Sequence, residues 1–227
     1  MWAIIKKEVK SYFLSPIAYI FIGLFLAMCS IFFYIDVYFY GSTNFEYMFY
    51  SASTILTFIV PVLTMRMFSE ERKNGTEQLL YTSPRSTTSI VMAKFISATT
   101  IIVICELFTL IYLGILMYFG DPHITTAIVT LIGFLLLSMA YIAFGMFASS
   151  LTENQIIAGV ITMAGLIVMW FMPNFYSNLS EFSIINIFSN TFPQGIITYP
   201  ALILLLSFTI LFIALTIIVI ARRKSIK

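Results

Sequence analysis

Few residues of this 227-residue chain could carry out acid–base, nucleophilic or metal chemistry. The only histidine, His123, lies in the turn-like sequence GDPH, whereas a metalloprotease needs several histidine and acidic ligands. The two cysteines, Cys29 and Cys105, lie in apolar runs without CxxC spacing. The sequence also contains no P-loop motif for nucleotide phosphates. We therefore expect no catalytic residues, no metal site and no cofactor bound by this chain itself.

The charged side chains gather in one stretch, FSEERKNGTEQLLYTSPRS, which we call the charged segment (residues 68–86). It holds six of the 22 formally charged residues of the chain. Asn74 and Gly75 favour a turn, and a short helix is predicted at about 76–82, before Pro84. Exposed acids and two adjacent leucines suit contact with another protein better than contact with a leaflet that attracts cations. The alternative is a solvated loop whose charges have no specific partner.

Long apolar runs flank the charged segment, and 60% of all residues are hydrophobic while only 10% are charged. A helix needs roughly 20 apolar residues to cross a bilayer, and its backbone polar groups must be paired internally. The sequence therefore predicts an all-α polytopic membrane protein, with one transmembrane domain over residues 1–227. The six predicted spans are 16–35, 48–67, 90–119, 124–148, 155–172 and 200–221.

Turn and capping signals separate the later spans. Thr152 and Gln155 fit a capping box that would start the fifth span. Pro173 is expected to close that span, and Pro200 is expected to lie in the first turn of the sixth. These signals support the division of the C-terminal half into three spans.

The basic residues all fall on one side of this topology. An even number of spans puts the N-terminus, the connection between spans two and three, and the C-terminus on the same side. These three regions hold all 12 lysines and arginines of the chain. The positive-inside rule then predicts that both termini and the charged segment are cytoplasmic.

Two further segments are too polar or too broken to span a membrane. Residues 1–15 predict an amphipathic interfacial helix, whose apolar face would carry Trp2, Ile5, Val9, Tyr12 and Phe13. Residues 173–199 are about half apolar and contain prolines, a glycine and several asparagines and serines. They predict a partly re-entrant external segment, which is allowed only where protein or water pairs its backbone.

Glu106 is an ionisable residue near the middle of the third predicted span. A charged carboxylate facing lipid there would cost several kcal/mol, about 2–3 or more. Glu106 could mark a transport path or a helix interface, or it could be a protonated carboxyl bonded to a neighbouring helix. If the second interpretation holds, Glu106→Gln should leave assembly intact.

Residues 61–98, PVLTMRMFSEERKNGTEQLLYTSPRSTTSIVMAKFISA, resemble the ABC-2 type transporter permeases. The resemblance is greatest to the branch that includes gliding-motility and nitrous-oxide-reductase-maturation permeases. Residues 6–25 and 149–160 resemble the same branch. The matching residues are Pro61, Thr64, Arg66, Glu70, Glu71, Gly75, Thr76, Glu77, Leu79, Leu80, Pro84, Ile90 and Lys94.

The resemblance implies a permease subunit of an ABC exporter in a bacterial plasma membrane, paired with a second, identical or homologous permease. The charged segment would contain the coupling helix that docks a separate ATP-binding subunit, which would hold ATP and Mg²⁺. Reversing Glu71 and Glu77 to lysine should then uncouple transport from hydrolysis. The implied docking residues are Ser69, Glu70, Glu71, Arg72, Gly75, Thr76, Glu77, Leu79, Leu80 and Pro84.

Two other classes of function stay open at the level of sequence. One is a membrane enzyme, although a nucleophilic serine would need a nearby base. The other is a membrane scaffold or ion-pathway protein unrelated to ABC transporters, for which Glu106 would be the next residue to test. Lipid is a partner in every case, and no nucleic-acid partner is expected. An ATP-binding protein that copurifies with the chain would separate the transporter from the other classes.

Overall fold

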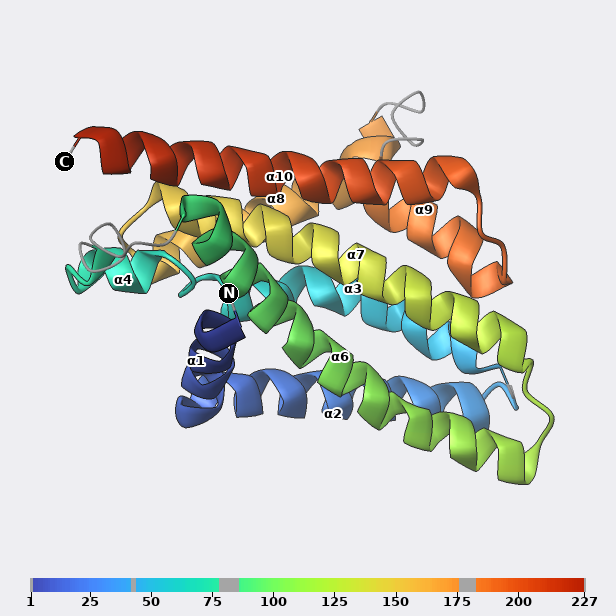
Figure 1. Ribbon diagram of the computed structural model, residues 1–227. Helices are drawn as coiled ribbons and strands as arrows, with labels where there is room; N and C mark the ends of the chain where they lie inside the picture. Colours follow the sequence, from blue (N-terminus) through green and yellow to red (C-terminus); the bar gives the residue numbers. More distant parts are fainter. Residues whose placement is uncertain (1, 42–43, 78–85, 176–182, 227) are drawn as a thin grey trace.

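The computed structural model describes residues 2–41, 44–77, 86–175 and 183–226. Every regular element in these ranges is helical. Six helices are long and apolar enough to cross a membrane, so the predicted all-α, six-span class is confirmed. They lie side by side as an elongated bundle, and both chain ends lie toward the same end of it (Figure 1).

The bundle is built from long helices with short elements at its two ends. The long helices are α2 (Pro16–Tyr38), α3 (Phe45–Thr64), α6 (Thr87–Phe119), α7 (Ile124–Leu151), α8 (Gln155–Phe175) and α10 (Tyr199–Ile226). The short elements are α1 (Trp2–Leu14), α4 (Ser69–Lys73), α9 (Ile184–Thr191) and the 3-10 helix η2 (Phe192–Gln194).

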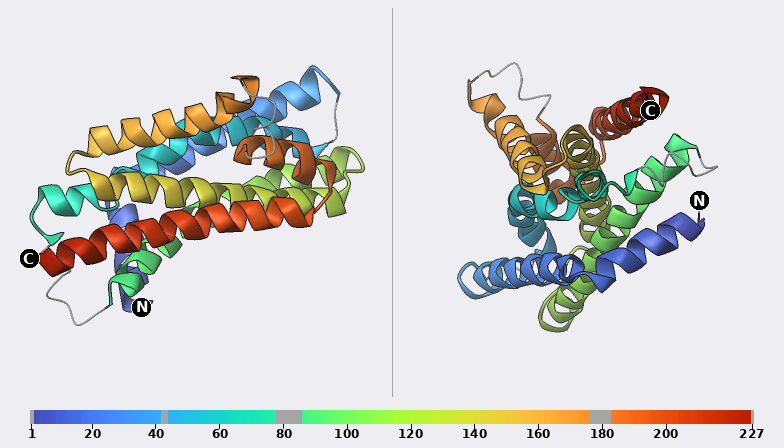
Figure 2. Two further views of the ribbon diagram at one scale, coloured as in Figure 1. Left: turned by 90° about the horizontal axis from the view of Figure 1, so that it is seen from above. Right: turned by 90° about the vertical axis from the view of Figure 1, so that its left-hand side faces the viewer.

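Helices α3 and α7 form the centre of the bundle. About 61% of the most apolar window of each is buried, compared with 17% for α2 and for α8 and 22% for α10. Seen along the bundle, α2, α6, α8 and α10 lie around this central pair (Figure 2). The peripheral helices therefore present broad apolar surfaces that a bilayer or another membrane protein can cover.

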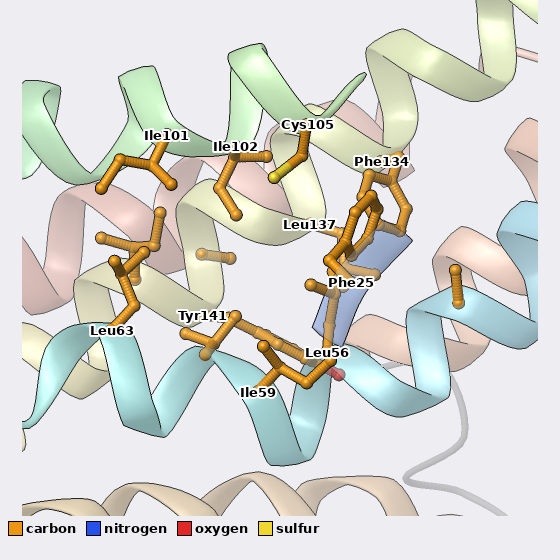
Figure 3. Packing of buried hydrophobic residues seen from close by; sticks show 14 of the residues in the cluster. Phe25, Leu56, Ile59, Leu63, Ile101, Ile102, Cys105, Phe134, Leu137 and Tyr141 are labelled. Carbon is orange, nitrogen blue, oxygen red and sulfur yellow. The ribbon is translucent and has the colours of Figure 1, made fainter. Parts of the chain in front are cut away.

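An aromatic cluster ties the central pair to its neighbours. The ring of Phe134 on α7 lies 5.8 Å from that of Phe25 on α2 and 4.9 Å from that of Phe49 on α3. The ring centroid of Phe188 on α9 lies 6.0 Å from that of Phe134, and the two distances above are also between ring centroids. Tilted and edge-to-face ring pairs of this kind add to the stabilisation from apolar burial. Figure 3 shows Phe25 and Phe134 beside the buried aliphatic residues of α3 and α6.

The segment between α8 and α10 packs into the bundle wherever the structure describes it. Phe188 and Phe192 are fully buried, and η2 contacts α7. Gly195, with φ of +73°, allows the turn that leads into α10. Residues 183–199 thus form a short helix and a turn against α7, rather than a solvated loop.

Helix α8 begins at Gln155 as predicted, but its capping residue and its end differ from the prediction. The helix continues through Pro173 to Phe175. A proline has no N–H to offer the carbonyl of Met169, and the hydroxyl of Ser183 donates to that carbonyl instead, at 3.3 Å. The predicted cap at Thr152 is also wrong, because Asn154 Oδ1 accepts from the Ile156 N–H at 2.9 Å.

Two other long helices begin or end away from the predicted positions. Helix α2 passes Asp36 and ends at Tyr38, because one acidic side chain does not interrupt backbone hydrogen bonding. Helix α3 ends at Thr64, earlier than the expected residue 67. Turns follow it and lead directly into α4.

Helix α1 crosses the end of the bundle at a steep angle to α2 (Figure 1). It contacts α6 and α2, so its apolar face meets protein. Trp2 is 78% exposed, unlike the rest of the predicted apolar face. The half-buried members of that face are Ile5, Val9, Tyr12 and Phe13.

We expect Gly133→Ala on α7 to destabilise the protein by about 1–3 kcal/mol, as overpacking does. A Cβ at this position would lie 2.2 Å from Cγ of the buried Phe192. Gly114→Ala on α6 is the matched control, because its Cβ would meet nothing within 4 Å. The midpoint of thermal unfolding in detergent should fall only for Gly133→Ala. Equal midpoints would show that η2 does not pack on α7 as described.

Candidate functional site

All described lysines and arginines lie at the end of the bundle formed by α1, α4, the start of α6 and the end of α10. We call this the basic end. The described part of the charged segment, residues 68–77, also lies here. It consists of α4, a turn through Asn74 and Gly75, and the start of the next segment at Glu77. Gly75 has φ of +71°, which confirms the predicted turn.

The predicted helix at 76–82 lies almost wholly outside the described residues, as do Leu79, Leu80 and Pro84. The helix that the structure does describe in the charged segment is α4, at 69–73. Sequence reasoning missed α4 because five residues, SEERK, carry too little apolar pattern to indicate a helix.

A serine from the end of α7 holds the start of α4 in place. Ser149 Oγ accepts hydrogen bonds from the backbone N–H groups of Phe68, at 3.1 Å, and Ser69, at 3.2 Å. The same hydroxyl donates to the carbonyl of Met65 at 3.1 Å. Ser149 therefore provides an acceptor for two backbone N–H groups at the start of α4. Ser69 itself is buried, and its hydroxyl donates to the Met65 carbonyl.

Arg72 ties the other side of α4 to the connection between α7 and α8. Its Nη2 lies 2.7 Å from Glu153 Oε1, and its Nη1 donates to the carbonyl of Leu151 at 3.3 Å. Glu153 is 61% exposed, so this ion pair contributes little to the free energy of folding. Its effect is to fix which way the arginine points.

The strongest electrostatic feature of the basic end is the ion-pair triad of Lys94, Glu8 and Glu71. Lys94 Nζ on α6 lies 2.8 Å from Glu71 Oε1 on α4 and 3.1 Å from Glu8 Oε2 on α1. The lysine side chain is only 4% exposed. The ring of Phe68 lies below the ammonium, with its centroid 5.3 Å away.

The triad brings together three elements that are far apart in the sequence. A buried ammonium is costly unless it is paired, and each carboxylate supplies part of the pairing. Separating α1 or α4 from α6 would remove a carboxylate from Lys94. The triad therefore favours a single arrangement of α1, α4 and α6.

Helix α10 reaches the same region through its C-terminal turn. Arg223 Nη1 lies 3.7 Å from Glu77 Oε1, where the carboxylate is 13% exposed and the arginine 24% exposed. The charged segment is thus linked to α1 and α6 through Lys94, to α7 through Ser149, and to α10 through Arg223.

The predicted docking residues divide into inward-facing and outward-facing groups. Glu70, Glu71, Arg72 and Glu77 are half-buried, and Ser69 is fully buried. Gly75 and Thr76 are exposed, together with Lys73 and Asn74. We call residues 73–76 the exposed turn. Within residues 68–77, this turn is the part most open to a partner.

This division changes what the Glu71→Lys substitution would test. A lysine at position 71 would place a second ammonium against Lys94, in a site that is mostly buried. Like charges there would disturb the fold as well as any docking contact. Substitutions in the exposed turn are the cleaner test of a docking surface.

Glu106 lies on α6, well away from the triad in sequence. It is 9% exposed, and its Oε1 is buried without a hydrogen-bond partner among the described residues. No described lysine or arginine forms an ion pair with this carboxyl group. Glu106 therefore does not belong to the cluster at the basic end.

Sequence reasoning did not assign a role to Glu8 or Ser149. Glu8 is the only acid among the three lysines of residues 1–15, and such an isolated opposite charge could have indicated an ion pair. Ser149 gave no such signal, because a serine near a helix end has many ordinary roles. Among the described residues, no group of three or more histidine, cysteine or acidic side chains is placed to hold a metal ion.

A family model described as "ABC-2 family transporter protein" matches residues 35–222 of the chain. The matched range includes the charged segment and four of the six long helices in full, namely α3, α6, α7 and α8. No curated protein gave a significant match.

We expect Lys94→Met to destabilise the protein by roughly 3 kcal/mol or more, because it leaves two mostly buried carboxylates without their base. Adding Glu71→Gln should restore part of that loss by removing one uncompensated charge. Lys73→Met, at an exposed position, is the control. Thermal unfolding in detergent measures all three. Equal midpoints for Lys94→Met and Lys73→Met would contradict the triad.

Glu106→Gln should keep membrane insertion intact and change the unfolding midpoint little, because no base within the described chain pairs with the carboxylate. Glutamine keeps the size of the side chain and removes only its capacity to ionise. Size-exclusion chromatography of the purified variant reports its assembly. Dissociation of an oligomer in this variant would instead identify an ionic partner on another chain.

Proposed function

Because the chain belongs to the ABC-2 family of transporter proteins, we propose that it is the transmembrane subunit of an ABC exporter. In this proposal a separate ATP-binding subunit, which carries ATP and Mg²⁺, docks on the charged segment. The main support for this proposal is the position of α4. This helix is hydrogen-bonded to Ser149 of α7, and its Glu71 shares Lys94 of α6 with Glu8 of α1.

The proposed orientation follows from charge. All described bases lie at one end of the bundle, and the positive-inside rule puts that end in the cytoplasm. Both termini and the charged segment are then cytoplasmic, where an ATP-binding subunit would be found. The membrane is the plasma membrane of a bacterium, in keeping with the permeases that the chain resembles.

The contacts of α4 suggest how force would pass into the bundle. A push on the exposed turn would move α4, and the Lys94 triad would transmit that movement to α1 and α6. Ser149 would transmit it to α7, one of the two central helices. Residues that are hydrogen-bonded and buried move together, so the charged segment would act as a lever.

A second permease, identical or homologous, would complete the translocation path. The peripheral helices α2, α8 and α10 have broad apolar surfaces, with at most 22% of their most apolar windows buried. Lipid would cover part of this surface and the second permease the rest. The cargo would pass between the two subunits.

The experiment that tests the proposal is purification of the tagged chain from its own host in mild detergent. We expect an ATP-binding protein to copurify at about one copy per permease. Thr76→Arg in the exposed turn should reduce this copurification about tenfold or more, as loss of a central contact does. The unfolding midpoint should change little, because Thr76 is exposed and loses only a solvent-exposed hydrogen bond to the Glu71 carbonyl.

Asp121→Arg is the matched control, since Asp121 is an exposed polar residue between α6 and α7, at the opposite end of the bundle. It should leave copurification unchanged. If no ATP-binding protein accompanies the stable wild-type chain after gentle cross-linking, the transporter proposal fails. The scaffold or ion-pathway alternative would then be favoured.

A further inference from the structure

A polar cavity of about 270 Å³ lies between α1 and the charged segment. Helix α1 contributes Lys7, Ser11 and Tyr12 to its wall, and the opposite wall includes Arg66 and Glu70. The nearby carboxylates add to the effect of burial in raising the pKa of the Tyr12 phenol, so this group stays neutral. The Lys94 triad closes one side of the cavity.

Two cations of the cavity wall form no ion pair with a described residue. Arg66 forms no ion pair or hydrogen bond with any described residue, and its Nε is buried without an acceptor. Lys7 is exposed on α1 and also forms no ion pair within the described part of the chain. A buried guanidinium N–H without an acceptor is costly, so an acceptor from outside the chain would stabilise this arrangement.

Two acids of the same cavity have carboxylate oxygens that remain available to a ligand. Glu70 forms no ion pair with any described residue, although it is four residues from Arg66 and lines the cavity with it. Glu71 uses Oε1 to bind Lys94, and its Oε2 is buried without a hydrogen-bond partner. The cavity therefore offers unsatisfied donors on one group of residues and unsatisfied acceptors on another.

The cavity lies beside the ends of two apolar helices, where the headgroups of a surrounding bilayer are expected. Ser15 and Ile17, at the start of α2, line it, and Arg66 follows the end of α3, so its wall includes the ends of two membrane spans. Helix α1 beside it has exposed Trp2 and Leu14, residues suited to a membrane interface. In other membrane proteins, basic side chains between membrane helices bind the phosphate groups of lipid headgroups.

We propose that this cavity binds the headgroup of an ethanolamine phospholipid from the adjoining leaflet. The phosphate accepts hydrogen bonds from Arg66 and Lys7, and the ammonium donates to Glu70 and to Glu71 Oε2. Both kinds of unsatisfied group are then paired by one zwitterionic ligand. A bound headgroup would hold α1 against the charged segment.

The charges of the wall favour this ligand over other phospholipids. Lys7, Arg66 and Lys94 are balanced by Glu8, Glu70 and Glu71, so the wall has no net charge to attract a purely anionic lipid. A glycerol headgroup has no cation for the two acids. A choline headgroup has a cation but no N–H group to donate.

The test is native mass spectrometry of the purified full-length chain with ethanolamine, choline and glycerol phospholipids of identical acyl chains. We expect the ethanolamine lipid to be retained most strongly. Charge-assisted hydrogen bonds are strong enough that Arg66→Gln and Lys7→Gln should each weaken this retention about tenfold. The test needs no ATP-binding subunit, so it does not depend on the proposed transport function.

Lys6→Gln is the matched control for Lys7→Gln, because Lys6 is the neighbouring exposed lysine and does not line the cavity. The Lys6→Gln variant should retain the ethanolamine lipid as strongly as the wild type does. If Arg66→Gln fails to fold, the lipid retention of Lys7→Gln still tests the proposed site. An exposed lysine that forms no ion pair with a described residue is dispensable for folding. Equal loss in Lys6→Gln and Lys7→Gln would overturn the proposed site.

Three further outcomes would also overturn the proposal. Equal retention of the three lipids would mean that the headgroup is not recognised. Preference for the glycerol lipid would indicate an anion site without a role for the acids. Displacement of the ethanolamine lipid by an equal concentration of glycerophosphoethanolamine would point to a soluble ligand rather than a membrane lipid; failure to displace it supports the lipid.

Discussion

The arrangement of the basic end depends on how the ammonium of Lys94 is kept paired. A lysine buried to this extent must have carboxylate partners, and Lys94 takes one from α1 and one from α4. Neither acid is near Lys94 in the sequence, so the pairing constrains the tertiary arrangement. Helix α1 must cross the end of the bundle, and α4 must follow α3 immediately, for both carboxylates to reach the lysine.

Helix α7 connects this polar end to the apolar interior. Near its C-terminus, Ser149 binds the backbone of the α3–α4 turn. Further along, Phe134 contacts rings from α2, α3 and α9, while Gly133 leaves room for Phe192. One central helix thus contacts both the segment proposed to dock an ATP-binding subunit and the residues packed near the opposite end.

The cavity beside Lys94 contains further polar groups that need partners. The triad satisfies three charged groups, but Arg66, Glu70 and Glu71 Oε2 remain without partners in the described chain. A headgroup that pairs them would join the lipid leaflet to the same elements that an ATP-binding subunit would move. The position of α1 would then respond both to the leaflet and to the charged segment.

The sequence by itself determined the all-α class, the number of spans and the gathering of bases at one end, because apolar length and charge are local properties. It indicated the turn at Gly75 for the same reason. Only the tertiary structure decided that Glu71 faces Lys94, that Ser149 caps α4, and that Ser183 bonds the carbonyl freed by Pro173. Each of these contacts joins residues at least 14 positions apart, and no local pattern encodes such a pairing.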